Sequence, residues 1–482
     1  MIATKNITTE RIFYCLLLLF IITGYSKPVY AASGDTSKTL VVQISTDTTA
    51  KITPIDSTIV KKRFWRASGE LMLAQIIPWA YNYFVRDAEF AHVTFASIGH
   101  NLKLSNWEWD DNNFTTNQIA HPYQGNLYFN AFRSNGYSFW QSAPASFAGS
   151  FMWEVAGETH PPAPNDFINT SVGGIILGEM THRVSNRIIN KKQRGVKRQV
   201  SEVFGFLIDP MGGFNRLLDG KWGRVSTVPL TDLDTMAMAG ELDIGARQIN
   251  EHTGNLFTKG KAGWYARLRL LYGDPFKPSK TPFNNFDIKV ELGDDDTAKI
   301  NNVSVNGLLS SWELKSNEKE DHIMSLTANY DFYHNSSFEY GAQSVTFSLY
   351  SKFTNDNDVN FTTRIGAGAV ILAAVPDPYL YYGEGRNYDY GPGFSLIGQA
   401  GIMVKNKLAF IFNYKGGWFV TINGNSSTHF LHTASGEVRY KIFDKFSIGA
   451  EGGYLILRGD YRDYPDYTSK YPFVRLSIGF RI

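Results

Sequence analysis

The sequence predicts an α+β membrane protein, in which an N-terminal helical domain precedes an antiparallel transmembrane β-barrel of about 12 strands. Apolar residues keep a helical spacing as far as about residue 225. From about Met236 to Ile482 they alternate with polar residues, which is the period of a β-strand. No helical segment separates the alternating stretches, and several of them reach the length of about ten residues that suits a tilted membrane strand.

The first residues of the chain predict export. Lys5 and Arg11 precede the apolar run IFYCLLLLFIIT, and small residues follow as far as Ala31, which is typical of a signal peptide over residues 1–31. An uncleaved anchor is the alternative, although the run is shorter than the roughly 20 residues of a membrane span. The single cysteine, Cys15, lies in this segment, so the mature chain is expected to form no disulfide. Residues 32–60 are rich in Ser and Thr and predict a flexible leader.

The charge of the chain argues against a nucleic-acid partner. The sequence contains 47 Lys and Arg against 45 Asp and Glu, with a formal net charge of +2. Proteins that bind nucleic acid usually carry a clustered surplus of basic residues. We therefore expect no nucleic acid among the partners, and no motif in the chain predicts a cofactor.

Helical spacing predicts a domain over residues 61–225. Its first helix contains Pro78, which is expected to kink or end it. The aromatic-rich stripe of this helix is interpreted as core packing, with docking on a membrane surface as the alternative. Residues 91–113 are expected to be irregular or to form a hairpin. Further helices are predicted near 124–133, 138–157 and 165–190, the last of them capped by Asn165 or Asp166.

Polar residues that are costly to bury gather in this domain among Trp, Phe, Ile and Gly. Glu154 and Glu158 are four residues apart, so they share one helix face. His121 precedes a proline and is therefore expected in an extended segment that enters a helix. Three segments can thus bring an imidazole, carboxylates and an amide together. The candidate catalytic residues are His121, Glu154 and Asp166, and the candidate binding residues are Asn169, Arg133, Glu158 and Glu179.

Four interpretations of this cluster are open. It is a satisfied polar core that locks the helices together, which we favour, or a hydrolase or transferase site with His121 as a base oriented by Glu154 or Asp166. Alternatively, carboxylate and amide oxygens bind a cation, or the cluster binds a lipid or peptidoglycan fragment. The spacing fits neither an EF-hand nor an HExxH helix, so we assign no metal ligand.

The motifs HPYQG, NDFINTSVGGIILGE and the later pair Asp209-Pro210 occur in this order within roughly residues 90–220. Together they resemble domain-of-unknown-function family 3943. The resemblance implies a protein of the Gram-negative cell envelope that has no established activity.

The second half of the chain predicts an even number of strands, as bacterial barrels favour. Long loops alternate with short turns, which places both ends of the barrel on the periplasmic side, and a soluble β-sandwich is the alternative. The segment 301–314 alternates least clearly. The strands are predicted near 236–249, 263–273, 286–294, 301–314, 321–334, 339–353, 360–374, 391–405, 408–422, 430–442, 445–458 and 471–482.

We therefore expect a protein of the outer membrane whose helical domain is periplasmic or lies in the barrel lumen, where it docks on or plugs the barrel. A structural or transport-related role in the envelope, including an open channel, follows from this arrangement. The alternative is an outer-membrane hydrolase or transferase that acts on lipid or cell-wall material through His121, Glu154 and Asp166. Expected partners are outer-membrane lipid, the barrel-assembly machinery and a lipid or cell-wall ligand.

Overall fold

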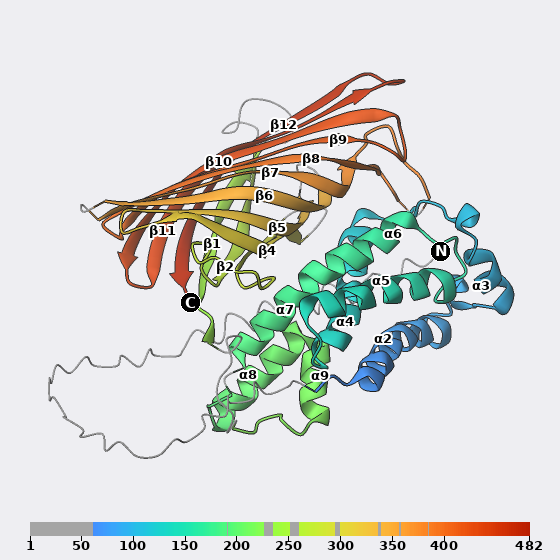
Figure 1. The fold of residues 1–482 in the computed structure, drawn as a ribbon. Coiled ribbons are helices and arrows are strands. Elements are labelled where there is room, and N and C mark those ends of the chain that lie inside the picture. The colour runs from blue at the N-terminus through green and yellow to red at the C-terminus, as the bar shows by residue number, and fades with distance from the viewer. Residues whose placement is uncertain are drawn as a thin grey trace, which may run out of the picture.

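The computed structural model describes residues 61–189, 191–225, 235–250, 260–294, 299–335, 339–355, 358–383 and 385–482. The predicted signal peptide and leader lie outside these residues. Figure 1 shows a helical part, coloured blue to green, beside a barrel that is coloured green to red. The predicted fold class is confirmed, because helices from Phe64 to Leu218 precede a closed antiparallel barrel.

The helical part contains α-helices, short 3₁₀ segments and two π-helical turns. In chain order these are α2 (Phe64–Phe84), η1 (Glu89–Ala91), α3 (Phe95–Asn101), η2 (Leu104–Asn106), η3 (Thr116–Ala120), α4 (His121–Arg133), α5 (Phe139–Ala156), α6 (Pro164–Ile168), η4 (Asn169–Gly173), α7 (Gly174–Ile188), α8 (Gly195–Ile208) and α9 (Pro210–Leu218). The π-helical turns are η3 and η4.

Several local predictions differ from this structure. Pro78 lies inside α2, which continues to Phe84. The stretch 91–113, expected to be irregular, contains α3, because Thr94 forms a capping box with Ser97. The long helix predicted from Asn165 is divided into α6, η4 and α7, and it starts after Ala163 because Pro164 occupies the first turn, where a proline is tolerated.

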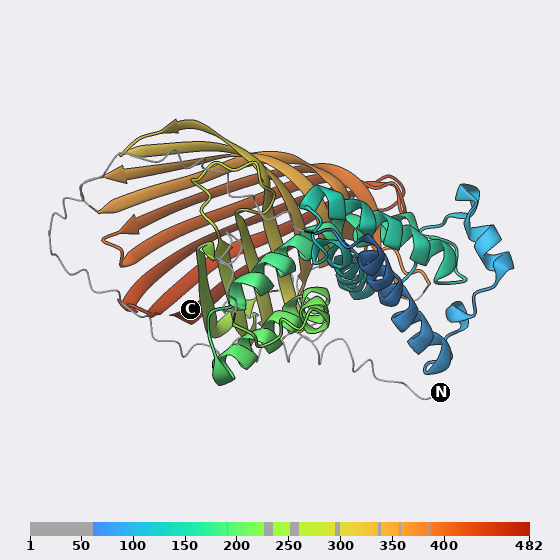
Figure 2. The ribbon, with the colours of Figure 1, turned by 60° about the horizontal axis from the view of Figure 1, so that its bottom comes forward.

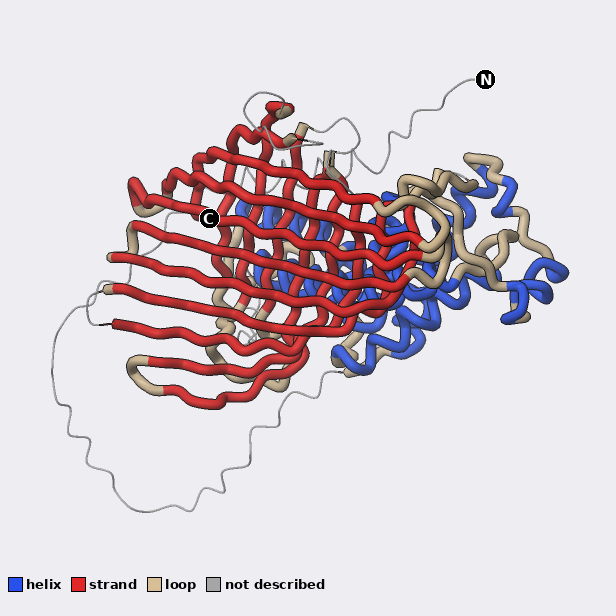
Figure 3. The backbone as a smooth tube through the Cα atoms, turned by 90° about the horizontal axis from the view of Figure 1, so that it is seen from above, coloured by secondary structure: helices blue, strands red, loops and turns tan. Residues whose placement is uncertain are grey.

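Twelve strands form the closed barrel, and β1 pairs with β12 to close it. Figure 3 shows them side by side as one curved wall. Every predicted strand is present, including the doubtful fourth. The bounds are β1 (Met238–Ile249), β2 (Lys261–Tyr272), β3 (Phe286–Gly293), β4 (Ile300–Ser316), β5 (Glu320–His334), β6 (Glu339–Asn355), β7 (Val359–Pro376), β8 (Tyr388–Val404), β9 (Leu408–Val420), β10 (Ser427–Phe443), β11 (Phe446–Tyr461) and β12 (Tyr467–Arg481).

The strand register separates a polar inner face from an apolar outer face. Arg267 on β2 is opposite Glu291 on β3, and both line the lumen, whereas the neighbouring pair Leu268 and Val290 faces outward. Much of the outer face is exposed, with Ile365 at 68% and Leu476 at 62%. An apolar exterior around a polar interior is the pattern of a membrane barrel. Among the described residues, no helix is long and apolar enough to span a bilayer.

The helical domain packs on the outside of the barrel wall. Ile288, Val305 and Tyr330 are in register across β3, β4 and β5 on the outward face. They share one apolar core with Phe129 of α4 and Ile176 of α7. Figures 1 and 2 show the helices against this wall and beyond one end of the barrel. The described helices therefore dock on the barrel and do not fill its lumen.

Polar contacts fix this arrangement. The Asn117 side-chain amide donates to the Tyr388 hydroxyl at 2.8 Å. The Tyr330 hydroxyl donates to the backbone carbonyl of Gln118. Near the C-terminal end of α7, the Arg183 guanidinium donates to the Pro282 carbonyl at 2.8 Å. The apolar contact thus has hydrogen bonds at both ends, which sets the position of the helices on the wall.

Candidate functional site: a buried histidine and carboxylate cluster

His121 is positioned by the close contact between α4 and the segment that begins at Asn169. A Cβ atom at Gly125 would lie 1.7 Å from the Thr170 carbonyl oxygen, so the two backbones touch. His121 is the first residue of α4 and has helical backbone angles, so the prediction of an extended segment was wrong. The π-helical turn η3 continues directly into α4, and the proline that follows His121 fits the first helical turn.

The structure brings the three candidate catalytic residues together. His121 Nε2 lies 3.6 Å from Asp166 Oδ2, and the Thr170 hydroxyl is 3.2 Å from His121 Nδ1. Glu154 reaches the same place from α5, where its Oε2 accepts a hydrogen bond of 2.8 Å from the Ala163 amide. One potential ligand atom from each of His121, Glu154 and Asp166 lies within 4.8 Å of the others.

Burial sets the protonation of this cluster. Burial raises the pKa of Glu154 to about 8, and the charge of Asp110 adds to the effect. The pKa values of Glu158 and Asp166 are raised well above their usual range, first by burial and then by the neighbouring carboxylates. Burial also lowers the pKa of His121. Burial thus favours the neutral imidazole of His121 and the protonated forms of the carboxyl groups around it.

The cluster reaches solvent through the histidine. The His121 side chain is 14% exposed, while that of Asp166 is 4% exposed. Glu154 is 1% exposed. A small molecule or an ion that approaches the imidazole thus meets two carboxyl groups behind it.

The other candidate binding residues divide into separate contacts. Arg133 Nε pairs with Glu179 Oε2 at 2.7 Å, and Arg183 Nε pairs with Glu179 Oε1 at 2.8 Å. Burial alone would raise the pKa of Glu179, but its two arginine partners lower it. Asn169 donates to the Asn117 carbonyl at 3.1 Å and so ties η4 to η3. Arg133 and Glu179 thus form a compensated ion-pair cluster of their own.

Sequence reasoning missed two neighbours of the site. The charge of Asp110 acts to raise the pKa of His121 and of Glu154. Asp110 was missed because it follows Trp109 in a stretch that was expected to be irregular. Tyr390 comes from the barrel and accepts a hydrogen bond from Asn165 at 3.2 Å. The acidic pair after Trp109 was a signal for the first, whereas no local pattern marks the second.

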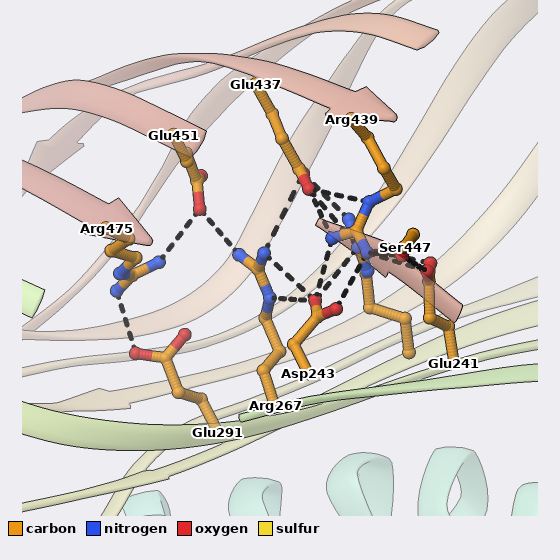
Figure 4. A network of polar contacts seen from close by, with 10 residues as sticks. Glu241, Asp243, Arg267, Glu291, Glu437, Arg439, Ser447, Glu451 and Arg475 are labelled. Atoms are coloured by element: carbon orange, nitrogen blue, oxygen red, sulfur yellow. Dashed lines mark hydrogen bonds and ion pairs between the residues drawn. The ribbon is translucent and has the colours of Figure 1, made fainter. Parts of the chain in front are cut away.

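The barrel lumen is a second candidate, because it contains a cavity of about 820 Å³ lined by charged side chains. Ion pairs cross this space between strands that are not neighbours. Arg267 on β2 pairs with Glu451 on β11 at 2.7 Å, and Arg439 on β10 pairs with Asp243 on β1 at 2.8 Å. Figure 4 shows these guanidinium groups among carboxylates that come mostly from other strands.

An apolar cluster lies across the lumen, at the end opposite the short turns that join β8 to β9 and β10 to β11. The rings of Tyr340 on β6 and Phe419 on β9 are 5.6 Å apart between centroids. The cluster also contains Ala342, Val370, Ala373, Val375, Leu431, Leu457 and Tyr471. The cavity extends from the short turns, at Lys407 and Asp444, as far as Phe473. Within the described residues, the ion pairs and this cluster therefore occupy much of the path through the barrel.

His121, Glu154 and Asp166 offer a nitrogen and carboxylate oxygens, which are ligands that first-row divalent metals accept. The same groups suit proton transfer, since a neutral imidazole accepts a proton and a protonated carboxyl donates one. Both uses require the geometry found here, with the groups a few ångströms apart and open to solvent on one side.

Among curated proteins, none matches this chain. Solved structures with a similar barrel include the outer membrane channel DcaP of Acinetobacter baumannii, with 10% identity and a TM-score of 0.25 over 51% of this chain and 97% of that chain. The KdgM porin has 11% identity and a TM-score of 0.23 over 49% and 98% of the two chains. An anion-selective porin from Comamonas acidovorans has 8% identity and a TM-score of 0.22 over 52% and 99%. These values are too low to carry an argument about function.

The helical domain has a more specific relationship. Residues 106–211 match the family described as a domain of unknown function, DUF3943. This range contains the whole cluster of His121, Glu154 and Asp166. The resemblance predicted from the motifs is therefore confirmed over residues 106–211.

Proposed function

We propose that this is an outer-membrane protein of a Gram-negative cell, in which the barrel anchors the helical domain and the cluster of His121, Glu154 and Asp166 is the functional centre. The exposed apolar outer wall supports the membrane location. Outer-membrane lipid is then a partner, and the barrel-assembly machinery inserts the strands. The helical domain lies beside the barrel, on its outer wall.

The contents of the lumen support a structural role for the barrel. Arg267 and Arg439 pair across the lumen with carboxylates of other strands, and the apolar cluster around Tyr340 lies beyond them. A lumen crossed by ion pairs and an apolar cluster is a rigid support, whereas a water-filled channel requires a continuous open path. We therefore assign the barrel to anchoring and place the chemistry in the helical domain.

One observation carries this proposal: within the described residues, the carboxyl groups around His121 have no arginine or lysine partner, whereas the buried Glu70, Glu179 and Glu202 of the same domain do. Glu179 is held by Arg133 and Arg183. Glu154 accepts a hydrogen bond from the Ala163 amide and Asp166 accepts one from Asn165, but both are neutral donors, and the pKa of the neighbouring histidine is lowered. Buried acids without compensation are costly, and such groups concentrate at functional sites.

The arrangement supports an acid–base centre of a hydrolase or transferase. The neutral His121 imidazole accepts a proton from an attacking hydroxyl or water, and a protonated Glu154 or Asp166 returns one to the leaving group. A substrate from the membrane or the cell wall fits the location. The convergence of ligand atoms within 4.8 Å favours divalent-cation binding by the same three residues as a second candidate.

The test compares two isosteric substitutions that each remove one buried carboxylate. Glu154→Gln should leave thermal melting of the purified protein unchanged or raise it, because no ion pair is broken, yet it should abolish rescue of a deletion strain. Glu179→Gln is the matched control, and it should lower the free energy of unfolding by roughly 3–5 kcal/mol because two arginines lose their partner.

A clear loss of stability in Glu154→Gln would assign the cluster to the structural core. Full rescue by a stable Glu154→Gln protein would remove Glu154 from any catalytic role. If rescue is lost, isothermal titration with Mn²⁺ or Zn²⁺ separates the two candidates, since a cation site binds the metal in the wild type and loses affinity in the variant.

A further inference from the structure

Helices α2 and α5 are apolar over most of their surface, but the rest of the protein covers only part of it. In α2 the charged residues are Arg66 and Glu70, and both face inward. Arg66 Nε donates to Glu70 at 3.1 Å, Arg66 Nη1 reaches Asp219 at 2.5 Å, and Glu70 is 3% exposed. In α5 the one charged residue is Glu154, which belongs to the buried cluster.

The exposed sides of both helices are therefore free of charge. On α2 the exposed stripe includes Trp65 at 85%, Ile77 at 63% and Phe84 at 73%. On α5 it includes Trp140 at 61% and Phe151 at 40%. Other exposed apolar residues of these stripes are Phe64, Met72, Leu73, Ile76, Tyr81 and Phe147.

The two stripes belong to neighbouring helices. Gln75 on α2 donates to the Gly149 carbonyl on α5 at 2.6 Å, so the helices are in direct contact. Figure 1 shows α2 on the side of the helical domain that is turned away from the barrel. A helix that is apolar all round belongs in a protein core or in a membrane. An uncharged exposed surface of this kind is an interaction site.

The barrel indicates what covers this surface. The helices dock on the outward wall of β3, β4 and β5, and the same outer wall continues around the barrel with exposed Ile365, Phe412 and Leu476. The bilayer that the proposed membrane location places around those residues extends sideways to the helical domain. Charged residues stand only at the ends of the α2 stripe, with Lys61, Lys62 and Arg63 before it and Arg86 and Asp87 after it.

We propose that the exposed stripes of α2 and α5 insert into the acyl-chain region of one leaflet of the bilayer that surrounds the barrel. This inference rests on the proposed membrane location of the barrel. Trp65, Tyr81 and Trp140 suit the boundary between acyl chains and head groups, and the flanking lysines meet the head groups. The domain then lies within the membrane plane, where a lipid is the nearest source of substrate.

The experiment uses the full mature chain, in which removal of the predicted signal peptide leaves no native cysteine. Ile77→Cys on α2, Ile365→Cys on the outer wall of β7 and Lys319→Cys in the exposed turn after β4 each receive a nitroxide spin label. Each protein is reconstituted in vesicles of phosphatidylethanolamine and phosphatidylglycerol, and heat-modifiable migration verifies the barrel. Collision with oxygen reports lipid exposure, and collision with nickel-EDDA reports water exposure.

The ratio of oxygen to nickel-EDDA collisions at Ile77 should rise to the value at Ile365 and exceed that at Lys319. A water-like ratio at Ile77 with a lipid-like ratio at Ile365 overturns this inference and leaves the proposed function intact. Water-like ratios at both sites overturn the membrane location itself. Exclusion of both reagents at Ile77 means that protein covers the stripe, as in a dimer, and also overturns the inference.

Discussion

The side-chain amide of Asn165 donates a hydrogen bond to the hydroxyl of Tyr390, 3.2 Å away, and a second one of 2.8 Å to Asp166 Oδ1. One residue of α6 thus connects the start of β8 with the candidate site. Tyr390→Phe removes the acceptor and leaves a buried amide hydrogen without a partner. We expect a loss of roughly 1–3 kcal/mol in the stability of the helical domain, measured by thermal melting of the helical circular-dichroism signal. Tyr440→Phe on the exposed outer wall is the control and should change nothing.

The pH dependence of stability follows from the buried acids. Glu154 has a pKa of about 8 in the folded protein against 4.5 ordinarily, so between these values the folded state holds a proton that the unfolded state has lost. The free energy of unfolding therefore falls as the pH rises towards 8. Glu158 and Asp166, whose pKa values are also raised, act in the same direction.

Melting should be measured from pH 6.5 to 8, because His121 has the opposite effect below its ordinary pKa of 6.5. The pKa of Glu179 is lowered, so this group does not titrate in that window. Glu154→Gln should flatten the decline of the melting temperature with pH. An identical slope in the wild type and the variant would contradict the raised pKa of Glu154.

The contact between α4 and α7 predicts the effect of a single methyl group. A Cβ atom at Gly174 would lie 2.4 Å from the Gly125 carbonyl carbon, so the helices must separate in Gly174→Ala. Overpacking of this kind costs roughly 1–3 kcal/mol, which thermal melting detects. Gly99→Ala is the matched control, since no atom lies within 4 Å of the added methyl group. There the better helix propensity of alanine should stabilise α3 by up to about 1 kcal/mol.

The barrel was predictable because strand alternation is a local signal. Each residue pair such as Arg267 and Leu268 shows its two faces in the sequence, and the pattern repeats through every strand. What covers the outward face was not predictable. The outward residues of β3 to β5, such as Ile288 and Tyr330, are apolar whether lipid or a helix covers them. The sequence therefore could not distinguish helices in the lumen from helices docked on the outer wall, where the structure places them.

The sequence predicted which residues belong to the candidate site, but not that Glu179 lies in a separate ion-pair cluster. Helical spacing indicated Glu154 and Asp166, the proline after His121 placed that residue at a helix entry, and the structure places the three side chains together. The same spacing joined Glu179 to them, although Arg133 and Arg183 compensate that carboxylate in a separate cluster. Such pairing depends on how α4 and α7 cross, which no local pattern records. The backbone of His121 was also misjudged, because the π-helical turn η3 continues into α4.

The orientation of β12 gives a prediction about the membrane itself. Leu476 faces outward and is 62% exposed, whereas its neighbour Arg475 lines the cavity. Leu476→Arg places a charge on the lipid side and should cost roughly 2–4 kcal/mol near the middle of the bilayer. Arg475 is not a neutral control, because it pairs with Glu291 at 2.7 Å and with Glu451 at 3.4 Å.

Ser435→Arg is the better control for this experiment, since it introduces the same side chain into the cavity of about 820 Å³ that Ser435 lines. There the new guanidinium meets water and carboxylates such as Glu437 and not acyl chains. The measurement is the yield of heat-modifiable, folded barrel in outer-membrane fractions. Leu476→Arg should lower this yield several-fold, whereas Ser435→Arg should stay near the wild type. Equal yields, or a larger loss for Ser435→Arg, would reverse the assignment of the two faces of the wall.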